Sequence, residues 1–149
     1  MGRGQADTDG RVAVRDLVKR FGPVAAVDGV SLDVAPGEFV ALLGPSGSGK
    51  TTILMTIAGF EYPTSGRVEI GGEDVTWAPA NKRNLGMVFQ RYTLFPHMSV
   101  AENIAFPLKM RGVARAERER RALAALETVR LGGYGQRRTN QLSGGQQQR

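Results

Sequence analysis

The feature that most constrains this chain is a glycine-rich segment between an apolar stretch and a helix-forming stretch. Residues 44–51 read GPSGSGKT and match the pattern G-x-x-x-x-G-K-[ST]. The preceding run EFVALL, at 38–43, is continuously apolar after Glu38 and predicts a strand buried on both faces. The following run KTTILMTIA, at 50–58, predicts a helix that ends at Gly59. A strand, a glycine loop and a helix in this order predict a site for the phosphates of a nucleotide.

Each residue type in this loop has a chemical role. Glycines let backbone amides approach phosphate oxygens without a side-chain clash, and the start of the next helix adds partial positive charge there. Lys50 supplies a point charge for the β- and γ-phosphates, and the Thr51 hydroxyl can bind Mg²⁺. The alternative is a flexible turn with an incidental lysine, and the strand and helix patterns on either side argue against it.

The flanking segments predict a mixed α/β fold. Residues 12–21 and 30–34 partly alternate apolar with polar side chains, which is typical of half-buried antiparallel strands. Residues 67–70 and the glycine pair that follows them indicate a further hairpin, and LGMVF at 85–89 indicates a second buried strand. We therefore expect an antiparallel β part at the front of the chain.

The sequence becomes typical of helices beyond residue 90. Ser99 and Glu102 have the spacing of a capping box, so a helix should begin there, and Pro107 is expected to interrupt it. Residues 114–131 are rich in Ala, Leu, Glu and Arg and predict a helix that stops at a glycine pair.

Composition excludes several classes of protein. The chain has no cysteine, which excludes disulfides and thiolate metal sites, and its lone histidine, His97, argues against a protein-built zinc site. No apolar run approaches the roughly 20 residues that span a bilayer. The net charge of +6 raises nucleic acid as a partner. Most of the excess arginine lies at 111–121 and 130–138, where it is interspersed with Glu117 and Glu119, and a solvated helix face explains such runs more simply.

A second motif, LSGGQ, occupies residues 142–146. Ser143 and Gln146 have capping-box spacing, so a new helix should start there with a hydroxyl and two bare backbone amides at its end. Taken alone, this motif describes either an anion site or an ordinary capped helix.

The two motifs together resemble those of a known family. GPSGSGKTT, VFQ at 88–90 and LSGGQQQR at 142–149 are similar to the ATP-binding subunits of ABC transporters, and the resemblance runs from about Val12 to the last residue. The segment 82–112 is most similar to the importer subfamily for polyamines, sugars and iron. The resemblance implies an α/β fold of the P-loop NTPase (ABC ATPase) type.

The same resemblance divides the chain into parts and implies roles for individual residues. Residues 1–90 would form the phosphate-loop core with the antiparallel β part, 91–141 a helical subdomain, and 142–149 the signature motif. The residues that would bind ATP through its triphosphate are Gly44, Pro45, Ser46, Gly47, Ser48, Gly49, Lys50, Thr51 and Thr52. Lys50 and Gln90 would support catalysis, and Thr51 and Gln90 would bind Mg²⁺.

Further roles are implied outside the loop. Phe21 would stack on adenine, with core packing as the alternative, and Val27 would line the base or ribose pocket. Residues that would contact the nucleotide of a second subunit are Ser143, Gly144, Gly145 and Gln146. The family's switch histidine lies beyond the signature, so His97 is assigned no catalysis.

The resemblance also implies partners and a location. Two such subunits form a nucleotide sandwich and sit on transmembrane permease subunits at the cytoplasmic face of the membrane. Through the permease they serve a solute-binding protein, and we expect no nucleic-acid partner.

The family pattern continues beyond LSGGQQQR to a strand that ends in Asp-Glu and to a switch histidine, and neither occurs in these 149 residues. We therefore expect a single incomplete domain that lacks the C-terminal part of the core and is inactive alone. A truncated gene model and a natural fragment both explain this. The rival functions are a non-hydrolysing nucleotide-binding fragment and a DNA-repair ABC ATPase. The latter would place long coiled coils between the motifs, where we find no sustained heptads.

Overall fold

The computed structural model describes residues 10–89 and 94–149. The chain forms two compact units, Met1–Met87 and Val88–Arg149. Each unit has its own hydrophobic cluster. Within the described residues, no helix is both long enough and apolar enough to cross a membrane.

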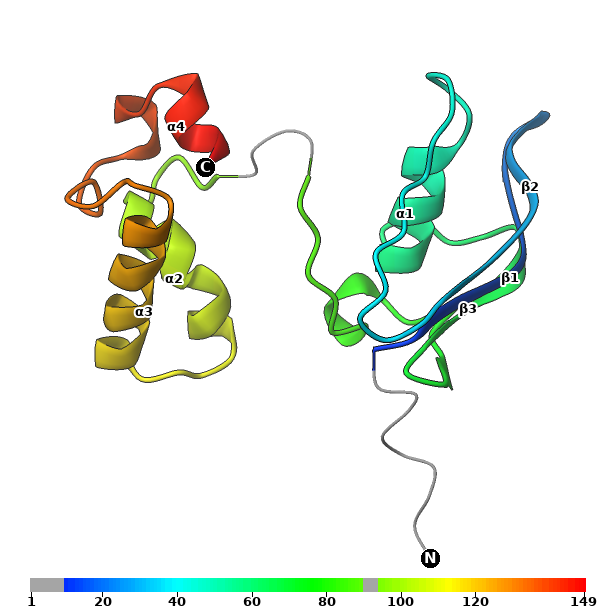
Figure 1. Cartoon of the computed structure of the whole chain (residues 1–149), viewed down its shortest axis with the longest axis horizontal. Coiled ribbons are helices and arrows are strands. Elements are labelled where there is room, and N and C mark those ends of the chain that lie inside the picture. Colours follow the sequence, from blue (N-terminus) through cyan, green and yellow to red (C-terminus); the bar gives the residue numbers. More distant parts are fainter. Residues whose placement is uncertain (1–9, 90–93) are drawn as a thin grey trace, which may run out of the picture. The chain divides into compact units, whose positions relative to one another are not determined.

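The first unit is built on a four-stranded antiparallel sheet with strand order β2-β1-β3-β4 (Figure 1). The strands are β1 (Val12–Phe21), β2 (Val24–Val34), β3 (Ser65–Ile70) and β4 (Glu73–Asp74). The front hairpin, predicted from alternation, and the hairpin predicted from the glycine pair are confirmed, although β2 begins earlier than predicted.

Helix α1 (Lys50–Ala58) lies against one face of this sheet (Figure 1). Its bounds and its left-handed cap at Gly59 agree with the prediction. Ile53 of α1 is buried in one cluster with Val14 and Leu17 of β1 and Val68 of β3. Val14 and Leu17 are three residues apart, and the register shift between them in the β1–β2 pairing lets both side chains reach the same core as Ile53 and Val68.

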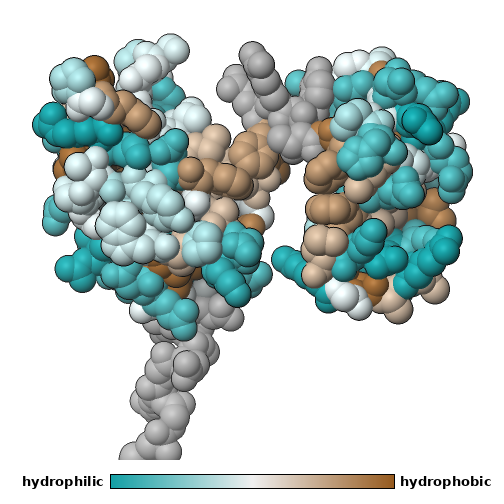
Figure 2. Space-filling view, turned by 180° about the vertical axis from the view of Figure 1, so that it is seen from behind, coloured by the Kyte–Doolittle hydropathy of each residue, from teal (hydrophilic) through white to brown (hydrophobic). Residues whose placement is uncertain are grey.

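The two buried strands predicted at 38–43 and 85–89 do not form. Among the described residues no strand pairs with either segment, and Phe39, Leu43 and Val88 are 92%, 91% and 98% exposed. Hydrophobic side chains are visible at the surface in Figure 2. The prediction fails because an apolar run becomes a strand only beside a neighbour that satisfies its backbone groups.

The second unit is helical. It contains α2 (Val100–Met110), α3 (Arg115–Thr128) and the short α4 (Gly144–Gln148), with a single 3₁₀ turn at Thr139–Gln141 before α4. Its core residues, which come from two helices and from the loops that follow α3, are Val100, Leu126, Leu131 and Leu142.

Two expectations for these helices need correction. Helix α2 runs through Pro107 instead of being interrupted there, and the Arg111 amide still donates to the Pro107 carbonyl at 3.2 Å. Pro107 has no amide hydrogen to donate to the preceding turn, but its φ is fixed in the helical range, so the chain keeps its helical course through this position. Helix α3 ends at Thr128 rather than at residue 131, where Leu131 instead packs into the core.

Candidate functional site

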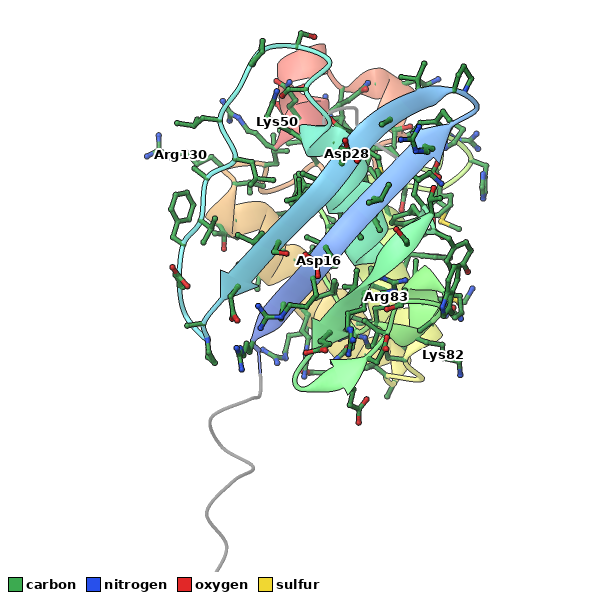
Figure 3. All side chains as sticks on the ribbon, turned by 90° about the vertical axis from the view of Figure 1, so that its right-hand side faces the viewer. Asp16, Asp28, Lys50, Lys82, Arg83 and Arg130 are labelled. Atoms are coloured by element: carbon green, nitrogen blue, oxygen red, sulfur yellow. The ribbon has the colours of Figure 1, made fainter. Side chains whose placement is uncertain are left out.

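The glycine-rich loop closes around the Lys50 side chain. The Lys50 ammonium donates to the carbonyl oxygens of Gly44 (2.9 Å) and Pro45 (2.6 Å) and to the Ser48 hydroxyl (3.0 Å). Ser48 also donates its amide to the Pro45 carbonyl at 3.3 Å. The loop is therefore a formed ring with its one cation at the start of α1 (Figure 3).

Gly49 joins this loop to α1 and lies directly on strand β2. It adopts a left-handed conformation (φ +85°), and a Cβ atom there would stand 2.2 Å from the Ala26 carbonyl oxygen. Only glycine fits such a close backbone approach. The same hypothetical Cβ would be 3.4 Å from Val27 Cγ2, so the Val27 side chain lies next to Gly49 at the end of the loop. Val27 is buried in the core cluster of the first unit.

The first amides of α1 are free of side-chain caps. Gly49 has no side chain to accept from them, and no acidic residue stands in the first turn. The positive end of the helix dipole is therefore left for an external anion. Other residues predicted to bind the triphosphate share this end of the helix. Pro45, Ser46, Gly47, Ser48 and Thr51 are exposed, and Thr52 is half-buried.

Phe21 ends β1 and is 49% exposed. The Lys19 ammonium lies 4.9 Å from the ring centroid, in reach of a cation–π contact. Lys19 also donates to the Tyr62 carbonyl at 2.7 Å and pairs with Glu61 at 2.9 Å. Sequence reasoning missed Lys19. Its spacing of two from Phe21 was the available signal, because such residues share one face of a strand.

The signature motif begins α4 in the second unit. The Ser143 hydroxyl accepts from the Gln146 amide at 3.3 Å, and the Gln146 side chain accepts from the Ser143 amide at 2.9 Å. This confirms the predicted capping box, and Gly144 and Gly145 form the exposed first turn between the two residues. Leu142 anchors the motif in the core of this unit.

Two further predicted positions have different outcomes. Gln90 lies outside the described residues, so its predicted role stays a prediction. His97 is exposed and meets Phe95 edge-on, with 6.0 Å between ring centroids. The described residues hold no group of three or more His, Cys, Asp or Glu side chains that could bind a metal by themselves. A cation here would need phosphate oxygens as ligands beside the Thr51 hydroxyl, which is the way Mg²⁺ is held with nucleotides.

A formed glycine loop, its lysine and an uncapped helix start define a phosphate-binding loop of the nucleotide-binding kind. The sequence profile of the ABC transporter family matches residues 27–149. The chain belongs to the ABC transporter family.

Individual relatives agree with this assignment. The chain is 53% identical over 140 residues to the Fe(3+) ions import ATP-binding protein FbpC 1 of Rhizobium meliloti (strain 1021), covering 94% of this chain and 40% of that protein. It is 54% identical over 136 residues to the spermidine/putrescine import ATP-binding protein PotA of Pseudomonas aeruginosa (strain UCBPP-PA14), covering 91% of this chain and 38% of that protein. The chain thus spans about two fifths of the length of these relatives.

A solved structure shares the fold. The ATP-binding cassette MJ0796, in a dimeric post-hydrolysis state bound to ADP and Pi, superposes with a TM-score of 0.81 at 33% identity. The match covers 91% of this chain and 65% of that one. The α/β P-loop NTPase fold of ABC ATPases, with an antiparallel β part and helices, is therefore confirmed.

Proposed function

We propose that this chain is the nucleotide-binding part of an ATP-binding subunit that energises an ABC transporter for solute import. The observation that carries the proposal is the Lys50 ammonium inside the formed loop, within 3.0 Å of two carbonyls and a hydroxyl. A triphosphate offers stronger acceptors than these neutral groups, so the lysine can exchange its loop contacts for charge-assisted ones.

The proposed roles follow the order of the loop and helix. Backbone amides of residues 44–52, apart from Pro45, which has no amide hydrogen, surround the phosphates, and Lys50 binds the β- and γ-phosphates. The exposed Phe21 ring stacks on adenine, and Val27, which is buried next to Gly49, lines the base or ribose pocket. Residues proposed to contact the nucleotide of a second subunit are Ser143, Gly144, Gly145 and Gln146. The dimeric cassette to which this chain is similar supports that arrangement.

Magnesium is the cofactor that this site would use with ATP. The Thr51 hydroxyl, exposed in the first turn of α1, and the Gln90 side chain are the residues we propose to hold it. The ion would neutralise developing charge on the phosphates. Lys50 and the α1 amides supply the chain's own share of that charge compensation.

Replacement of Lys50 tests the nucleotide site. Lys50→Ala removes a charge-assisted contact, so ATP binding should weaken roughly 10- to 100-fold. A fluorescent ATP analogue is titrated against wild type, Lys50→Ala and the control Lys82→Ala, in which an exposed lysine of the same unit is lost. All three are compared as folded monomers. Equal affinities of wild type and Lys50→Ala would contradict the assignment of a nucleotide site to this loop.

We further propose that the 149 residues bind ATP without turning it over. Hydrolysis needs a carboxylate to polarise the water and a second acidic group near Mg²⁺. After LSGGQ only Gln147, Gln148 and Arg149 follow, and none is acidic. Phosphate release with Mg-ATP should therefore stay at background. Turnover that disappears in Lys50→Ala would prove this wrong.

The partner we propose for the second unit is a membrane-spanning permease subunit, which would hold this chain at the cytoplasmic face and connect it to a solute-binding protein. The names of both import relatives support that choice. The loop before α2 exposes Phe95, whose ring packs on Phe106 with centroids 4.6 Å apart. Beside it lies a groove of about 520 Å³, and among its lining residues are Met98, Glu102, Lys109, Arg115 and Arg118.

Cross-linking tests this partner surface. The chain has no cysteine, so Phe95→Cys and Met98→Cys each introduce a unique thiol. We expect both to link to a permease subunit in an assembled transporter, whereas Glu127→Cys on exposed α3 surface serves as the control. Absence of links from both loop positions would contradict the proposal.

A further inference from the structure

Arg83 lies at the opposite end of α1 from the phosphate loop and is 3% exposed. Its Nη1 donates to the carbonyl oxygens of Thr56 (2.7 Å) and Ile57 (2.9 Å), in the last turn of the helix. Its Nε donates to the Ala78 carbonyl at 2.8 Å and its Nη2 to the Thr76 carbonyl at 2.9 Å. All four hydrogen bonds of this buried cation thus go to backbone carbonyls.

No acidic side chain in the described part of the chain forms a salt bridge with Arg83. A buried charge without a counter-ion is costly, unless oriented dipoles take the place of the counter-ion. The carbonyls of a helix C-terminus are such dipoles, because they carry the negative end of the helix dipole. Helix α1 has no basic residue of its own in the last turn, so Arg83 supplies the cation from elsewhere in the sequence.

Gly59 leaves the space that the guanidinium occupies. A Cβ atom at this position would lie 2.5 Å from Arg83 Nε and 3.0 Å from Arg83 Cζ. The helix end is therefore shaped to receive this side chain. The neighbouring Lys82, by contrast, is exposed and points away from the ribbon, as Figure 3 shows.

Arg83 also connects the helix end to the sheet. Thr76, whose carbonyl accepts from Arg83, is itself hydrogen-bonded to strand β3. The Thr76 hydroxyl accepts from the Val68 amide at 2.9 Å and donates to the Asp74 carboxylate at 2.6 Å. Through these contacts Arg83 fixes the C-terminal end of α1, while Ile53 packs the middle of the helix into the core.

The two ends of α1 act on the same helix. Nine residues at a rise of 1.5 Å separate the ends by about 12 Å, so Arg83 cannot touch a ligand at the loop. It can set the position and direction of the helix whose first amides face the phosphates, and a cation at one end complements an anion at the other.

We propose that Arg83 is a positioning residue for the phosphate site, holding α1 so that its uncapped amides and Lys50 are aimed at a polyphosphate. This inference rests on the proposed nucleotide function. Arg83 should therefore affect how tightly the loop binds phosphates and leave the binding of the base unchanged.

The test compares two competitors of a fluorescent ATP analogue: inorganic tripolyphosphate, which can use only the phosphate loop, and adenosine, which can use only the base contacts. In Arg83→Met, which removes the charge, the affinity for tripolyphosphate should fall about tenfold while that for adenosine changes less than about twofold. Arg83→Lys keeps the charge but has fewer hydrogen-bond donors, so its affinity for tripolyphosphate should fall only about threefold. Lys82→Met is the matched control and should bind both competitors like wild type.

The outcomes separate this inference from the function beneath it. If the wild type binds tripolyphosphate and Arg83→Met binds it equally well, the positioning role is overturned. An equal proportional loss of adenosine and tripolyphosphate also overturns it, because general loosening of the fold would act on both. If circular dichroism shows that Arg83→Met is unfolded, folded Arg83→Lys decides the question. A selective loss of its affinity for tripolyphosphate supports the positioning role of Arg83, and unchanged affinity overturns it. A wild type that binds neither competitor contradicts the nucleotide site itself.

Discussion

The start of α1 in the first unit and the start of α2 in the second differ in what their first amides contact. At α2 the Ser99 hydroxyl accepts from the Glu102 amide at 3.2 Å, and the Glu102 carboxylate accepts from the Ser99 amide at 2.7 Å. At α1 the cap is Gly49, which has no side chain, and the first turn holds no acid. The first amides of α2 are thus capped by side chains of the same helix start, whereas the first amides of α1 remain available to a ligand.

This difference distinguishes a structural helix end from a binding one. Both ends carry the same partial positive charge, because that charge comes from the backbone. The carboxylate of Glu102 occupies it at α2, and its hydrogen bonds to the backbone amide and the hydroxyl of Ser99 hold the pKa of Glu102 below its usual value. At α1 the first turn contributes the Lys50 ammonium and no acidic side chain, so the site is arranged for an anion from outside.

The largest expected effect comes from breaking the start of α1 at Gly49. In Gly49→Ala the new Cβ would stand 2.2 Å from the Ala26 carbonyl oxygen, in a left-handed backbone conformation. The free energy of unfolding of the first unit should therefore fall by about 2–4 kcal/mol, and the loop should no longer bind ATP. Gly47→Ala is the control, since it has a similar φ of +82° with nothing within 4 Å and should cost about 1 kcal/mol. Urea unfolding with an ATP titration measures both. Equal losses in the two variants would contradict the close approach.

A smaller effect is expected from breaking the start of α2. Ser99→Ala removes the hydroxyl that caps the Glu102 amide and should lower the free energy of unfolding of the second unit by about 1 kcal/mol. ATP affinity should not change, because this end binds no ligand in our account. Ser99→Thr keeps a hydroxyl and is the control. A fall in ATP affinity in folded Ser99→Ala would remove the distinction between the two helix ends.

The smallest effect concerns pH. The pKa of Glu102 is lowered in the folded chain, so the stability it contributes is present above the pKa of the unfolded chain and is lost as pH falls through the folded value. In Glu102→Gln the amide can still accept from Ser99, but nothing titrates there. Unfolding midpoints of the second unit between neutral and acidic pH should therefore fall less steeply in the variant. Identical slopes would show that Glu102 carries no such linkage.

The elements that sequence predicted well depend on neighbours close in the chain. The bounds of α1, its glycine cap, the front hairpin and both capping boxes follow from spacing alone. The apolar runs at 38–43 and 85–89 were wrongly predicted as strands, because a strand needs a pairing partner that no local pattern supplies.

The site shows the same limit. The loop and Lys50 could be named from their motif, and the signature from its own. Arg83 could not, because its partners Thr56 and Ile57 lie 27 and 26 positions away and only the fold brings them to the guanidinium. A single arginine in a polar stretch gives no sign in the sequence that it will be buried at a helix end.

A single experiment can compare the two helix starts as binding sites for ATP. Backbone amide resonances are followed by NMR during a titration of the isotope-labelled chain with Mg-ATP. Amides of residues 46–52 should shift with a common binding curve, while those of residues 100–103, at the self-capped start of α2, should stay in place. Unmoved amides at 46–52, or equal shifts at both helix starts, would contradict this distinction.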